Sequence, residues 1–158
     1  MSIDDLKSLM DTFEPSALLP ELDSVLGVAG SAVRIAVLAG PIVVLVMGLV
    51  YLFAAPREAN YYLGYRCYFG MGSVEAWRYT QRIAGLAWTL LGLILTVVMF
   101  IITGKYAQME IHDILSSGMT CILWEAGLVA VSCLAINILV MINFNADGEI
   151  RRRKVTQK

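Results

Sequence analysis

The sequence predicts an all-α integral membrane protein with three transmembrane helices, preceded by an amphipathic, interfacial N-terminal helical segment. Hydrophobic residues make up 58% of the 158 residues and charged residues only 16%, a composition outside the range of soluble domains. Three stretches contain no charged residue: 35–56, 83–104 and 126–146. Each is long enough to cross a hydrocarbon core of about 30 Å as a helix. Long continuous apolar runs predict helices and not the alternating strands of a membrane barrel.

Basic residues gather on alternate sides of these three stretches, and this pattern predicts the orientation. Nine of the twelve lysines and arginines follow the first stretch or the third: Arg57, Arg66, Arg78, Arg82, Arg151, Arg152, Arg153, Lys154 and Lys158. The other segments contain only Lys7, Arg34 and Lys105, and the N-terminal part is acidic. By the positive-inside rule, we expect the N-terminus outside and the C-terminus in the cytoplasm. An acidic start without a basic region also predicts that the first helix, and not a cleaved signal peptide, directs insertion.

The chain divides into three parts on this interpretation. Residues 1–33 form an outward acidic segment, with an amphipathic helix over 3–13 that Pro15 and Pro20 interrupt. Residues 34–146 form a three-helix membrane domain with a cytoplasmic loop at 57–82 and a kink at Pro41. Residues 147–158 form a basic cytoplasmic tail that is solvated or lies on anionic lipid. A separate, shallow membrane segment at 22–34 is an alternative that the sequence leaves open.

Local signals place the second and third helices. Ser73 is a suitable N-cap for the second helix, and Glu75 would lie in its first turn, where a negative charge is favoured. Trp77 is then expected near the lipid headgroups, on one face with Gln81, Gly85 and Trp88. The third helix is expected over 119–144.

Glu125 stands out because a carboxylate within a membrane helix is costly, by about 2.5 to 3.5 kcal/mol near the centre. With the third helix starting near residue 119, Glu125 lies about 9 Å from its outer end. Arg34 enters the first helix from the same side. We therefore expect Arg34 and Glu125 to form an intramembrane ion pair, with a ligand or ion site as the alternative.

Residues that could carry other chemistry are few. His112 lies on the short outer loop, in a segment that offers too few ligands for a metal site. Catalytic triads, HExxH and phosphate-binding loop motifs are absent, and Cys67, Cys121 and Cys133 lack metal or redox spacing. The sequence predicts no catalytic residue, no cofactor, no metal and no direct contact with nucleic acid, and so a protein that is not an enzyme.

The loop after the first helix carries the most specific pattern. It reads Asn60, three residues, Gly64-Tyr65-Arg66, then Trp77 and Gly85. This order resembles the signature of the SdpI family, which reads roughly N-x3-GYRT, then W-x2-AN, then a glycine that opens the next helix. Cys67 stands where that family has threonine, Ser73 stands near its usual asparagine, and Thr80-Gln81 replaces its Ala-Asn.

The resemblance implies a bacterial plasma-membrane protein without enzymatic activity, which confers immunity to a toxin or senses one. The best-known member is an immunity protein and is also associated with holding a transcriptional repressor at the membrane. The partners implied are the lipid bilayer, a peptide toxin or membrane-protein partner, and a cytoplasmic regulator. The alternatives are a helical interaction subunit of a larger complex, packed through small residues such as Ala126 and Ala130, and a small oligomeric transporter or channel lined by Glu125 and Asn137. A homo-oligomer is compatible with each.

The residues of this loop also have a physical interpretation. Gly64 can adopt a backbone angle that other residues avoid, which allows a sharp turn under the membrane. Tyr65 and Arg66 would then point to the interface, and Arg66 is expected to pair with Glu75 or bind a lipid phosphate. The candidate functional loop therefore comprises Asn60, Gly64, Tyr65, Arg66, Glu75, Trp77, Arg82 and Gly85.

Overall fold

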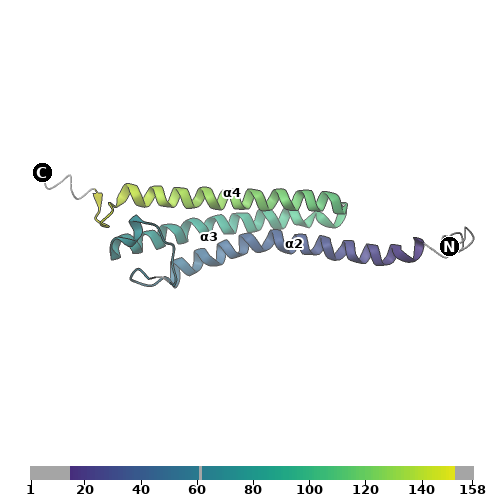
Figure 1. The fold of residues 1–158 in the computed structure, drawn as a ribbon, viewed down its shortest axis with the longest axis horizontal. Coiled ribbons are helices and arrows are strands. Elements are labelled where there is room, and N and C mark those ends of the chain that lie inside the picture. The colour runs from purple at the N-terminus through teal and green to yellow at the C-terminus, as the bar shows by residue number, and fades with distance from the viewer. Residues whose placement is uncertain (1–14, 61, 152–158) are drawn as a thin grey trace, which may run out of the picture.

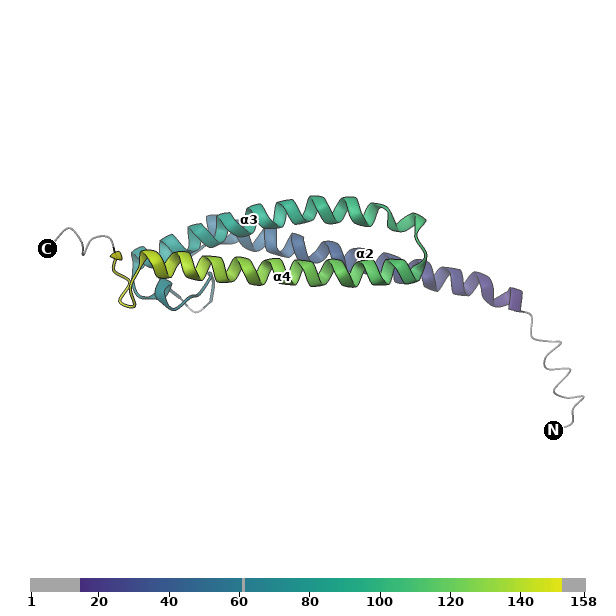
Figure 2. The same cartoon turned by 90° about the horizontal axis from the view of Figure 1, so that it is seen from above.

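The structure is a computed structural model that describes residues 15–60 and 62–151, with side chains described from residue 24 onward. Three long helices lie side by side: α2 (Pro15–Phe53), α3 (Val74–Gly104) and α4 (Ile111–Asn143) (Figures 1 and 2). Residues 54–73, with the short 3-10 helix η1 (Phe69–Met71), join α2 to α3. Residues 105–110, with the 3-10 helix η2 (Tyr106–Gln108), join α3 to α4. The all-helical prediction is confirmed for the described part of the chain, which contains no strand.

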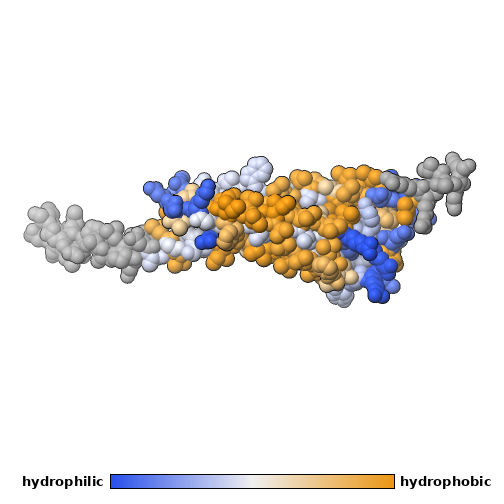
Figure 3. Space-filling view, turned by 180° about the vertical axis from the view of Figure 1, so that it is seen from behind, coloured by the Kyte–Doolittle hydropathy of each residue, from blue (hydrophilic) through white to orange (hydrophobic). Residues whose placement is uncertain are grey.

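All three helices are long and apolar enough to cross a membrane, over Ser24–Phe53, Val74–Gln108 and Ile111–Asn143. Apolar side chains cover the middle of the bundle, and hydrophilic side chains gather at its two ends (Figure 3). We call the end formed by residues 54–73 and 144–151 the loop end, and the end formed by residues 105–110 the hairpin end. The protein is therefore a membrane protein with both connections outside the apolar zone.

Helix α2 is longer than the sequence suggested. It begins at Pro15, a position that tolerates proline, and continues through Pro20 and Arg34 without a break. A separate membrane segment at 22–34 is therefore not formed, and the N-terminal part of α2 extends past the hairpin end (Figures 1 and 2). The amphipathic helix expected over 3–13 lies outside the described residues. Pro41 is fully buried within α2, and α2 is visibly bent in Figure 1.

The start of α3 and the end of α4 are close to the prediction, and the start of α4 is not. Ser73 has extended backbone and its side chain accepts a hydrogen bond from the Ala76 N–H, so it is the N-cap of α3, with Glu75 in the first turn. Helix α4 starts at Ile111, eight residues before the expected Met119. His112 therefore lies in the first turn of a helix and not on a loop. The polar residues at the start of α4 continue the helix beyond its most apolar part.

Helices α2 and α3 pack most closely, and α4 contacts both. Glycines make this approach possible: a Cβ at Gly48 would meet the backbone of Thr89, and one at Gly85 would lie 2.7 Å from Leu52 Cγ. One cluster of buried residues lies toward the loop end and includes Tyr51, Tyr65 and Phe144. A second cluster, toward the hairpin end, contains Val37, Leu95, Met99 and Cys121. The loop end is thus packed with large aromatic side chains, and these build the candidate site.

Candidate functional site

The loop that follows α2 has a defined shape at Gly64. Its φ of +125° lies in a region that residues with a Cβ rarely adopt, which confirms the turn predicted at this glycine. Upstream, the Asn60 side chain accepts hydrogen bonds from the N–H groups of Tyr62 and Leu63, at 3.1 and 2.9 Å. An asparagine that bonds to backbone two and three residues ahead stabilises a turn. Asn60 and Gly64 together therefore reverse the chain and direct the next residue toward the bundle.

Two side chains of α3 hold the reversed chain. The Tyr65 N–H donates to Gln81 Oε1 at 2.8 Å, and Gln81 Nε2 donates to the Tyr65 carbonyl at 2.8 Å. Trp77 has 0% of its surface exposed, and its indole N–H donates to the Pro56 carbonyl at 2.9 Å. The Gln81 amide thus satisfies both backbone groups of Tyr65, as a neighbouring strand would in a sheet. Trp77 holds the chain where it leaves α2. We call Gly64, Tyr65, Trp77 and Gln81 the Tyr65 site.

The Tyr65 side chain contacts all three helices. Its ring packs edge-on against Trp88 of α3 at 5.6 Å and Tyr51 of α2 at 6.5 Å between centroids. Its hydroxyl lies 3.2 Å from the Cys133 carbonyl and 3.3 Å from Asn137 Oδ1, both on α4. Burial raises the pKa of the Tyr65 phenol above its ordinary value, so the hydroxyl remains protonated and donates. The loop therefore closes the bundle by inserting one side chain between its helices.

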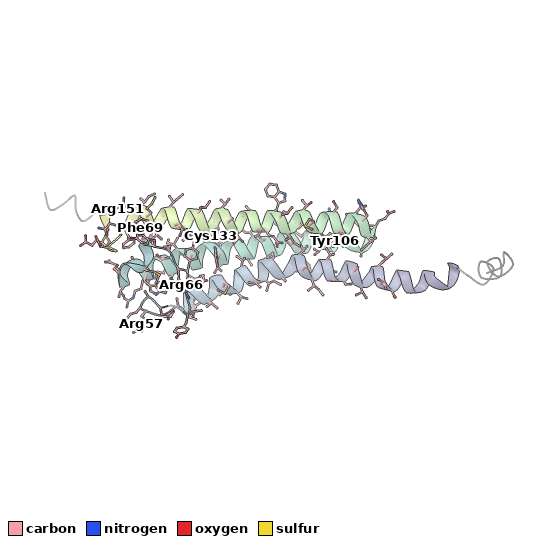
Figure 4. All side chains as sticks on the ribbon, viewed as in Figure 1. Arg57, Arg66, Phe69, Tyr106, Cys133 and Arg151 are labelled. Carbon is pink, nitrogen blue, oxygen red and sulfur yellow. The ribbon has the colours of Figure 1, made fainter. Side chains whose placement is uncertain are left out.

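The structure corrects the expected direction of both aromatic anchors. Tyr65 is buried and points into the bundle, and Trp77 is buried beneath the loop, whereas both were expected at the lipid interface. The reason is that each has a polar partner inside the protein, which a tyrosine or tryptophan needs when buried. Arg66, the next residue, is exposed, and Figure 4 shows it at the loop end with Arg57. Its pairing with Glu75 or with a lipid phosphate stays a prediction.

The end of α4 returns to the start of α3. The Ser73 hydroxyl donates to the Gly148 carbonyl at 2.7 Å, and Gly148 has a φ of +74°. Phe144 and Ile150 form an isolated bridge, and Arg151 Nε donates to the Phe144 carbonyl at 3.1 Å. Residues 144–151 are therefore a turn that rests on the N-cap of α3, beside the Tyr65 site.

Glu125 occupies a different place from the one expected. It follows Ile111 by fourteen residues, so it lies about 21 Å along α4 and not about 9 Å from its end. Only 7% of its surface is exposed, and its Oε1 has no hydrogen-bond partner among the described residues. A Cβ at Gly40 would lie 2.5 Å from Glu125 Oε2, so the carboxyl rests against the backbone of α2.

The predicted ion pair between Arg34 and Glu125 is absent from the described residues. Arg34 is exposed near the hairpin end, in a cavity of about 600 Å³ that it shares with Tyr106 and Glu110. It precedes Gly40 by six residues, or about 9 Å along the helix. The misplaced start of α4 caused the error, because it made Glu125 seem as shallow as Arg34.

Several residues of the site escaped the sequence analysis. Gln81 was noted as sharing a face with Trp77 and as a departure from a family pattern, but it was given no role in the loop, and neither were Tyr51, Trp88 and Asn137. A glutamine on the face of Trp77 and Gly85 is a signal that could have identified Gln81, since a buried amide needs partners. The contacts of Tyr51 and Asn137 join segments far apart in the chain, and no local pattern announces them. Among the described residues, no group of three or more potential metal ligands lies together.

Three apolar helices closed at one end by a structured loop define a multi-pass helical membrane protein. Residues 57–142, more than half of the chain, match the sequence model of the SdpI/YfhL protein family. The chain belongs to this family, which is generally one of non-enzymatic membrane proteins, and the predicted family assignment is confirmed. Comparisons with curated proteins and with solved structures found no match.

Proposed function

We propose that this protein protects a bacterial cell against a toxin that acts at the plasma membrane, or senses such a toxin, with the loop end as its working surface. The observation that carries the proposal is the Tyr65 site, which lies within the region matched by the SdpI/YfhL family. A passive linker between two helices would not need a positive-φ glycine, a buried tyrosine and a glutamine clamp. These contacts instead hold Arg66 at a fixed place on the surface.

Arg66→Ala is the most direct test of this function. The variant should lose protection, or lose a cytoplasmic partner, because Arg66 is exposed and offers a guanidinium to a ligand. The amount of inserted protein should stay the same. The measurement is survival of a toxin-sensitive bacterium that expresses each variant and is challenged with a panel of membrane-active bacterial peptides.

Glu58→Ala is the matched control for Arg66→Ala, since Glu58 is an exposed charged residue of the same connection. It should protect as well as the unchanged protein. Full protection by Arg66→Ala at normal expression would overturn the role of this surface, and the extended N-terminal part of α2 would become the better candidate.

The orientation is part of the proposal and can be tested separately. The charge pattern predicts that the loop end faces the cytoplasm. In a variant without the native cysteines, Tyr62→Cys lies at the loop end and His112→Cys at the hairpin end, and both side chains are largely exposed. An impermeant thiol reagent should label residue 112 in intact cells and residue 62 only after lysis. Labelling of residue 62 in intact cells would reverse the orientation.

Glu125 favours a second candidate function, a small carrier of protons or cations. The carboxyl lies deep in the bundle, and its Oε1 has no hydrogen-bond partner in the described part of the chain, which is the usual mark of an ion pathway in a membrane helix. Asn137, the other residue expected to line a channel, gives this candidate less support, because its side chain accepts a hydrogen bond from the Tyr65 hydroxyl.

A liposome experiment separates the two candidate functions. Reconstituted protein should show no proton or cation flux above that of empty liposomes if protection is its activity. Flux that disappears in Glu125→Gln would instead establish the carrier. Because glutamine has nearly the same shape and no charge to desolvate, we expect Glu125→Gln to insert normally and to be at least as stable.

A further inference from the structure

A cavity of about 450 Å³ opens between the end of α2 and the start of α3 at the loop end. Three arginines line it: Arg57 from the connection, and Arg78 and Arg82 from successive turns of α3. None of the described residues that line it is acidic. Three positive charges on one cavity repel one another, and an anion placed between them would relieve that repulsion.

No ion pair among the described residues neutralises these arginines. Arg78 Nε donates to the Arg57 carbonyl at 3.4 Å, which places the start of α3 beside the connection. The Arg66 side chain also lies near enough to interact electrostatically with Tyr51, which lines the same cavity.

Two other cavities contain a carboxylate that offsets part of their positive charge. On the other side of Arg78 and Arg82 is a cavity of about 620 Å³ in which Glu75 supplies a carboxylate. At the hairpin end, the cavity lined by Arg34 is also lined by Glu110. The balance of charge therefore selects the cavity between α2 and α3 as the place for an anion.

The depth of the cavity indicates which anion would reach it. It lies where the apolar spans Ser24–Phe53 and Val74–Gln108 meet the loop end, which is the level of lipid headgroups. Phe53 is 84% exposed and Leu86, one turn beyond Arg82, is 52% exposed, so apolar surface lies beside the cavity for acyl chains. Guanidinium groups bind phosphate oxygens through paired hydrogen bonds.

We propose that Arg57, Arg78 and Arg82 form a binding site for a phosphate group, and that its source is the headgroup of an anionic phospholipid in the leaflet at the loop end. A bound lipid would bridge α2 and α3 just outside the Tyr65 site. The site would thereby couple the loop end to the lipid composition of its leaflet.

Native mass spectrometry of the full-length protein in non-ionic micelles tests the proposal, with phosphatidylglycerol as the probe. Phosphatidylcholine, which carries the same phosphodiester without net charge, should bind more weakly. Arg82→Gln should lower the affinity for phosphatidylglycerol by roughly tenfold or more, the value of one lost charge-assisted hydrogen bond. The triple variant Arg57→Gln, Arg78→Gln, Arg82→Gln should abolish preferential binding.

The control is Lys105→Gln, which removes one positive charge at the opposite end and should leave the affinity unchanged. Equal weakening by Lys105→Gln and Arg82→Gln would overturn the site in favour of general charge attraction. Displacement of phosphatidylglycerol by an equal concentration of inorganic phosphate would overturn the lipid as its source. If the triple variant does not fold, Arg82→Gln carries the test, since the Arg82 side chain makes no hydrogen bond within the described residues. In that case unchanged affinity in Arg82→Gln overturns the proposal.

Discussion

Tyr65→Ala should lower the free energy of unfolding by about 3 to 5 kcal/mol, the usual cost of removing a large buried aromatic side chain. The substitution removes ring contacts with Tyr51 and Trp88 and leaves the Cys133 carbonyl and Asn137 without a donor. These groups belong to three different helices, so the variant should loosen the whole loop end. The measurement is unfolding of the detergent-solubilised protein by a gradient of SDS.

Tyr62→Ala is the matched control, because Tyr62 lies three residues away in the same loop and is 95% exposed. Its loss should change stability by no more than about 0.5 kcal/mol. Tyr65→Phe should fall between the two, since it keeps the ring and loses only the hydrogen bond that the hydroxyl donates, worth about 1 kcal/mol. Equal stability of Tyr65→Ala and Tyr62→Ala would mean that the loop does not close the bundle.

The sequence predicted the features that depend on local pattern. Continuous apolar runs predicted the three helices, the Ser73 N-cap predicted the start of α3, and Gly64 predicted a turn. Each of these predictions needs only a few neighbouring residues and one local physical rule. The family resemblance rested on the order of residues in the same loop, and the matched region contains that loop.

The errors arose where a distant partner decides the structure. Trp77 was expected in the headgroups because a tryptophan near a membrane border usually lies there, but the Pro56 carbonyl, 21 positions earlier in the chain, receives its N–H. Tyr65 was expected at the lipid interface because tyrosine also favours that position, but its hydroxyl is held by Cys133 and Asn137 inside the bundle. The depth of Glu125 was wrong because hydropathy does not show how far a helix continues past the apolar zone.

Gly64→Ala should be the most damaging of the small substitutions. At a φ of +125° a residue with a Cβ is strained by about 1 to 3 kcal/mol. The new Cβ would also lie 2.7 Å from Trp77 Cη2 and 2.9 Å from Gln81 Oε1. Trp77 is fully buried and cannot move aside, so overpacking should add about 1 to 3 kcal/mol. We expect lower stability in SDS, loss of the Tyr65 clamp and, if the proposed function is correct, loss of protection.

Gly127→Ala is the matched control for Gly64→Ala, since Gly127 lies in the middle of α4 and a Cβ there would meet nothing within 4 Å. Alanine is favoured over glycine within a helix by about 1 kcal/mol, so this variant should be unchanged or more stable. If stability falls in Gly64→Ala but rises in Gly127→Ala, the left-handed turn and its contact with Trp77, and not the added methyl group itself, cause the loss at Gly64. If Gly64→Ala were as stable as Gly127→Ala and fully protective, the loop would not require the backbone geometry on which the Tyr65 site depends.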